Sequence, residues 1–82
     1  MVKVGINLHT VEKIRDFVNL ASRYSFEMDL GNGRYVIDAK SMMGIFSLDL
    51  SKEAELTINA EEYECQDFLE KLNVITQYRR IV

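Results

Sequence analysis

The chain has 82 residues, a formal net charge of −3 and a hydrophobic content of 48%, which together predict one folded domain with a modest core. The acidic balance disfavours nucleic acid as a partner, and without a signal-peptide pattern or an apolar run of the roughly 20 residues needed to cross a bilayer, we expect a cytoplasmic protein that does not insert into membranes. A single cysteine, Cys65, excludes an internal disulfide and provides no metal-ligand cluster, so we expect neither metal nor other cofactor.

The first half of the chain predicts a strand, a helix and a hairpin. Apolar residues alternate over residues 2–6, as in a strand with one buried face. Over residues 11–22 they recur every three and four positions, as on one face of a helix. Alternation returns over residues 26–30 and 35–39, on either side of Gly31-Asn32-Gly33. Glycine and asparagine tolerate positive φ, so these two runs predict a hairpin.

The second half predicts a short helix, a strand and a closing helix. Ser41 heads a methionine-rich helix over residues 41–47, where its side-chain oxygen can cap free amides. A strand follows over residues 56–60 and a helix over 65–75. The element order βαββαβα predicts one sheet with its helices on one face. The other face is expected to carry Asp29, Val36, Asp38, Thr57 and Asn59.

We expect Cys65 to be a buried helical residue. Residues 77–82 are expected to form a C-terminal tail that is disordered or docks on a partner or neighbour.

The segment Ala39-Lys40-Ser41-Met42-Met43-Gly44-Ile45-Phe46-Ser47-Leu48 resembles the regulatory-serine segment of the HPr family, the histidine-containing phosphocarriers of the bacterial phosphotransferase system. The similarity continues through Leu50, Lys52 and residues 55–60 and covers nearly the whole chain. It implies an α+β fold, an open-faced β-sandwich with a four-stranded antiparallel sheet covered on one face by three helices. The whole chain, residues 1–82, is then a single HPr-like domain.

The phosphohistidine site of that family is altered in this sequence. The family motif is Gly-Leu-His-x-Arg-Pro at the start of the first helix, where helix amides and the arginine hold the phosphate. This chain reads Asn7-Leu8-His9-Thr10-Val11-Glu12-Lys13. Leu8 and His9 match, but the glycine, arginine and proline are missing. Glu12 would oppose a phosphate about 5 Å away by roughly 3 kcal/mol per unit charge at an effective dielectric constant near 20, which Lys13 could offset only in part.

The motif can be aligned in two registers. Aligning Leu8-His9 directly needs an extra residue within the helix, which would rotate all that follows by about 100°. Aligning from Phe17 and Val18 instead places Thr10 where the family histidine lies, with Thr10 as helix N-cap and a shorter loop before it. We favour the second register because loops absorb length changes more easily than helices.

Three interpretations of His9 remain. It is a phospho-acceptor, with Thr10 and Val11 binding the phosphate, or an ordinary polar loop histidine, or a residue that binds a partner without phosphorylation.

The resemblance also assigns roles to the short helix. Besides its capping role, Ser41 is a candidate for regulatory phosphorylation by an HPr kinase. Met42, Met43 and Phe46 are candidates for an exposed partner-binding patch, although one side of this helix could simply pack on the core. Family positions matching these residues contact partner proteins.

The sequence thus predicts an HPr-like protein of the bacterial phosphoenolpyruvate-dependent sugar phosphotransferase system, and specifically a diverged, regulatory member. Its expected partners are proteins: an Enzyme I-like protein, an HPr kinase or a catabolite-control regulator. The alternatives are a working phosphocarrier that takes phosphate from Enzyme I on His9, and a scaffold that is never phosphorylated. We expect a monomer that is not an enzyme and has no catalytic pocket of its own.

Overall fold

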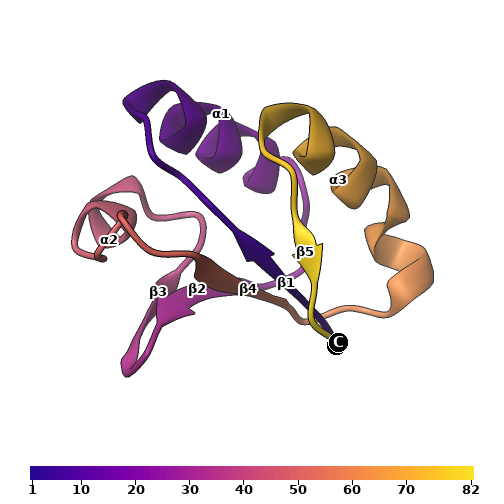
Figure 1. Cartoon of the computed structure of the whole chain (residues 1–82). Helices are drawn as coiled ribbons and strands as arrows, with labels where there is room; N and C mark the ends of the chain where they lie inside the picture. The colour runs from indigo at the N-terminus through magenta and orange to yellow at the C-terminus, as the bar shows by residue number, and fades with distance from the viewer.

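The computed structural model describes residues 1–82 as one antiparallel sheet of five strands with three helices (Figure 1). The strand order is β3-β2-β4-β1-β5. In chain order the elements are β1 (Val2–Ile6), α1 (Val11–Ala21), β2 (Met28–Asn32), β3 (Tyr35–Asp38), α2 (Met42–Phe46), β4 (Ala54–Ile58), α3 (Glu62–Ile75) and β5 (Arg79–Arg80). The α+β class, the antiparallel pairing and the order of the first seven elements agree with the sequence prediction.

The helices lie on one face of the sheet, where α1 and α3 pack side by side and α2 lies near β3 (Figure 1). Alternation explains this arrangement, because every second strand residue points to the same face. Val2, Val4 and Ile6 of β1 are almost completely buried, and Phe17 of α1 and Phe68 of α3 pack above the sheet in the same core cluster. The layer of helices therefore buries the apolar face that the sequence predicts.

The opposite face of the sheet is polar and open. Asp29, Val36, Asp38 and Asn59 are exposed and Thr57 is half-buried. The β2–β3 hairpin turns through Gly33, whose φ of 65° suits glycine. No helix of the chain has the length and apolarity that crossing a membrane requires.

The C-terminal residues form a fifth strand, which adds one strand to the predicted four-stranded sheet. Of the two alternatives for residues 77–82, disorder is therefore wrong. In β5, Arg79 and Arg80 pair with Gly5 and Val4 of β1. The Arg79 guanidinium donates two hydrogen bonds to Glu53, at 2.7 and 3.2 Å, and further backbone bonds tie residues 81–82 to Lys3. Strand pairing and a bidentate ion pair together fix this segment along the edge of β1.

Some element boundaries also differ from the prediction. Phe26 lies outside β2, and its ring packs with the rings of Tyr24 and Phe68 at centroid distances of 5.3 and 6.1 Å. Ala60 follows β4, which begins at Ala54 rather than at Leu56. Packing of side chains between elements has overridden the simple alternation at these ends.

Candidate functional site

The loop between β1 and α1 presents the candidate phospho-acceptor. Leu8 is buried and anchors this loop, whereas His9 and Thr10 are exposed. Thr10 has extended backbone angles, and its hydroxyl oxygen accepts a hydrogen bond from the Lys13 amide at 3.1 Å. Thr10 is therefore the N-cap of α1, as predicted, and Val11 is the first helical residue. His9 lies one residue before the cap.

His9 borders a shallow polar hollow of about 490 Å³ between the start of α1 and the end of α3. Its lining is Asn7, His9, Lys13, Asn73, Val74, Ile75, Thr76 and Gln77. The Thr76 hydroxyl donates to the backbone carbonyl of Asn7 at 2.9 Å, which ties the end of α3 to this loop. The sequence prediction missed this contribution of α3, because residues 69 positions apart give no local pattern.

The charged groups at this hollow differ from those of a strong phosphate site. Lys13 and His9 are the only basic side chains in the lining, and no arginine contributes. Glu12 is exposed in the first turn of α1 but does not line the hollow. A small anion could be held here by one lysine, the histidine and amide groups, without the bidentate contact that an arginine provides.

Ser41 caps α2. Its side-chain oxygen accepts a hydrogen bond from the Gly44 amide at 3.1 Å, and its backbone is extended. This geometry confirms the predicted N-cap. Ser41 is half-buried, and the preceding Lys40 is fixed by a hydrogen bond from its ammonium group to the Tyr24 carbonyl at 2.6 Å. The segment leading into α2 is therefore fixed by the Lys40 contact before Ser41 and by the Gly44 contact after it.

The three residues of the predicted partner patch are not equally exposed. Met43 is 82% exposed and Phe46 is 48% exposed, whereas Met42 is half-buried and packs against the core cluster. Ile45 is completely buried and anchors α2. A five-residue helix makes little more than one turn, so it cannot expose every apolar side chain. Met43 and Phe46 form the accessible part of the patch.

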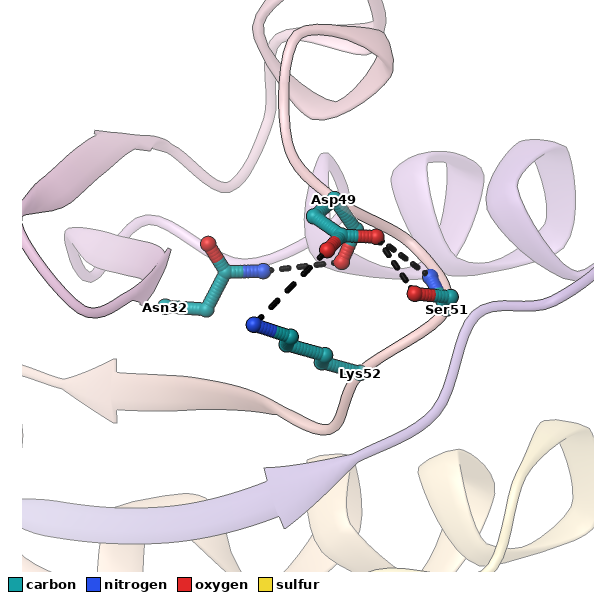
Figure 2. A network of polar contacts seen from close by, with 4 residues as sticks. All are labelled: Asn32, Asp49, Ser51 and Lys52. Carbon is teal, nitrogen blue, oxygen red and sulfur yellow. Dashed lines mark hydrogen bonds and ion pairs between the residues drawn. The ribbon is translucent and has the colours of Figure 1, made fainter.

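The loop that follows α2 is fixed by the polar network shown in Figure 2. The Asn32 side-chain amide, from the β2–β3 hairpin, donates to the Asp49 carbonyl at 2.9 Å. The Asp49 carboxylate accepts hydrogen bonds from the hydroxyl and the amide of Ser51, at 2.6 and 3.1 Å, and these bonds lower the pKa of Asp49. The ammonium nitrogen of Lys52 lies 4.0 Å from Oδ2 of the same carboxylate. The network holds the exit of α2 against the sheet.

The remaining candidate groups have structural roles. Cys65 is buried in α3 as predicted, and desolvation raises the pKa of its thiol, which disfavours the reactive thiolate. No three His, Cys, Asp or Glu side chains of residues 1–82 lie close enough together to hold a metal ion.

Comparisons with known proteins identify a matching family and a protein of similar sequence. A family model described as the PTS HPr component phosphorylation site matches residues 7–77. HPr-like protein Crh from Bacillus subtilis (strain 168) is 35% identical over 78 residues, which cover 92% of this chain and 92% of that protein. No solved structure matches the chain significantly.

Proposed function

This chain belongs to the HPr family, and from that membership we propose that it is a diverged regulatory member that acts through protein–protein contacts, with Ser41 as its phosphorylation site. Its partners in this role are an HPr kinase, a catabolite-control regulator or an Enzyme I-like protein, all in the cytoplasm. Regulation rather than phosphate transfer is favoured because the segment around Ser41 keeps the family pattern while the segment around His9 does not.

The observation that carries this proposal is the start of α1. Its N-cap is Thr10, which stands where the family histidine would lie in the register that avoids an insertion within the helix. His9 is then displaced by one residue, and the adjoining hollow has Lys13 but no arginine. A phosphoryl group at His9 would lack the bidentate partner that best matches phosphate geometry.

The geometry at Ser41 is compatible with modification. The Ser41 oxygen has one contact to a helix amide, that of Gly44, and a phosphate has three acceptor oxygens that could replace it. Met43 and Phe46 lie within the next five residues and are exposed. A phosphate added at Ser41 therefore places new charge beside an apolar surface, which can change partner affinity without unfolding the domain.

A kinase assay tests the proposed modification. Incubation with a bacterial HPr kinase and ATP should add one acid-stable phosphate to the wild type and none to Ser41→Ala. Ser47→Ala is a matched control, because Ser47 lies at the other end of α2, where its hydroxyl donates to the Gly44 carbonyl. Labelling that persists in Ser41→Ala, or no labelling of the folded wild type, would refute the switch and favour an unphosphorylated scaffold.

A binding assay tests the contact surface. Met43→Ala should weaken binding of the phosphorylated protein to a catabolite-control regulator, because truncation removes apolar area at about 25 cal/mol per Å² from the interface. Tyr63→Ala is the control, since Tyr63 is similarly exposed at 75% but lies on α3 and does not line the hollow beside His9. Equal losses for both variants, or no loss for Met43→Ala, would place the interface elsewhere.

The alternative function is phosphate transfer through His9. It is favoured by the exposure of His9 and by its position beside Lys13 in the polar hollow. In that case Enzyme I and phosphoenolpyruvate should label the wild type with an acid-labile phosphate that is absent from His9→Ala. Glu12→Arg should then increase labelling, since it replaces a repulsive charge with an attractive one.

A further inference from the structure

One edge of the sheet is open to a further strand. β3 (Tyr35–Asp38) is paired with β2 on one side and with nothing on the other, and it is the outermost strand beside α2 in Figure 1. Tyr35 and Val36 are 64% and 63% exposed, although both are large and apolar. An exposed strand edge with apolar side chains is a template for pairing with another chain.

The register identifies which backbone groups are free. The Ala39 amide donates to the Met28 carbonyl of β2 at 3.0 Å. Because hydrogen-bonded residues alternate along an antiparallel pair, Ile37 and Tyr35 also bond toward β2. The amide and carbonyl of Val36 and the amide of Asp38 therefore point away from β2, toward solvent.

We propose that β3 pairs in antiparallel fashion with β3 of a second copy of this chain, about a two-fold axis at Val36. In this register Val36 lies opposite Val36 of the second copy and exchanges two backbone hydrogen bonds with it. On the helix side Tyr35 lies opposite the second copy's Ile37, which is itself half-buried. The two five-stranded sheets then form one continuous sheet. The proposal does not depend on phosphorylation of either candidate site.

Charge complementarity specifies this partner. Arg34 precedes β3 and Asp38 ends it, so the two-fold axis places each Arg34 opposite the second copy's Asp38. Neither residue has an ion-pair partner within its own chain. One Asp38 oxygen accepts the Lys40 amide at 2.9 Å, which leaves the other carboxylate oxygen free. Because the surface is self-complementary, the contact closes at two copies.

The contact is expected to be weak, since four-residue strands bury less than the roughly 1,200 Å² typical of stable interfaces. The protein should therefore be a monomer in dilute solution and associate as its concentration rises. Sedimentation equilibrium up to about 1 mM protein should show a reversible monomer–dimer equilibrium. A wild type that stays monomeric over this range would overturn the proposal.

Val36→Pro tests the geometry. Proline at this outward-facing edge position removes no hydrogen bond within the monomer, but removes both Val36 donors from the dimer and should weaken association about tenfold or more. Val11→Pro is the matched control, because Val11 is exposed at the first helical position, where proline is tolerated. A dimer unaffected by Val36→Pro would show that another surface is used.

A charge exchange tests the partner. Arg34→Glu and Asp38→Lys should each weaken self-association, because each places like charges opposite one another in both pairs. An equimolar mixture of the two variants restores two opposite-charge pairs and should form heterodimers. If the mixture associates no better than either variant alone, the proposed register is wrong. Circular dichroism verifies that both variants are folded. If Asp38→Lys does not fold, the loss of self-association in Val36→Pro and in Arg34→Glu still tests the proposed contact.

Discussion

Replacing Ser41 with alanine removes the oxygen that accepts the Gly44 amide at 3.1 Å at the start of α2. Loss of such a cap costs about 1 kcal/mol, within a range of roughly 0.5–2 kcal/mol. In a domain of this size 1 kcal/mol lowers the melting temperature by about 4–8 °C. Urea and thermal unfolding, followed by circular dichroism, measure both quantities. The expected result for Ser41→Ala is a folded but measurably less stable protein.

The matched variant is Ser41→Asp, because aspartate is also a good N-cap and retains an acceptor oxygen. It should be more stable than Ser41→Ala and close to the wild type. This comparison separates loss of the cap from loss of a phosphorylation site in any functional assay. The capping argument would be refuted if Ser41→Ala were as stable as the wild type, or if Ser41→Asp were less stable than Ser41→Ala.

Other substitutions separate surface from core and test the end contacts. Met43→Ala should change the free energy of unfolding by less than about 0.5 kcal/mol, whereas Ile45→Ala should cost about 2–5 kcal/mol; similar urea midpoints would contradict their opposite exposures. Thr76→Val, which leaves the Asn7 carbonyl without its donor, should cost about 1–3 kcal/mol in the same assay, and no loss would contradict the contact. The arginine bonded to Glu53 lowers the pKa of that carboxyl, so its stabilisation is present above the ordinary glutamate pKa of about 4.3 and is lost as the pH falls through the lower folded value. The melting-temperature difference between wild type and Glu53→Gln should therefore shrink in acid, and a constant difference would exclude ionisation as its cause.

Local signals predicted most of the fold. The N-caps Thr10 and Ser41 could be predicted because capping depends on one side chain and amides three residues away. The hairpin could be placed because glycine is suited to the positive φ at residue 33. Alternation likewise identified which residues of β1 face the core.

The parts that sequence patterns could not predict depend on contacts between distant residues. β5 has only two residues, both arginines, so it has no alternating apolar pattern. Its position is stabilised by pairing with β1 and by ion pairs of Arg79 with Glu53 and of Arg80 with Glu62. The same limit applies to Met42, whose half-burial depends on how α2 is oriented against the core.

At the candidate site, the sequence placed Thr10 at the start of α1 but could not show what surrounds His9. The hollow beside His9 is completed by the end of α3, including Thr76 and Gln77. Those residues follow the last apolar positions of the helix pattern, where sequence boundaries are least certain. Which of His9 and Ser41 carries phosphate stays a prediction.

The central proposal is that this family member is phosphorylated on Ser41, its candidate regulatory serine, and not on His9, its candidate phospho-acceptor. The most direct test is the mass and acid stability of the phosphate gained when the wild type is supplied with both donor systems, Enzyme I with phosphoenolpyruvate and HPr kinase with ATP. We predict one acid-stable phosphate that is lost in Ser41→Ala. An acid-labile phosphate that is lost in His9→Ala would contradict the proposal and identify a working phosphocarrier.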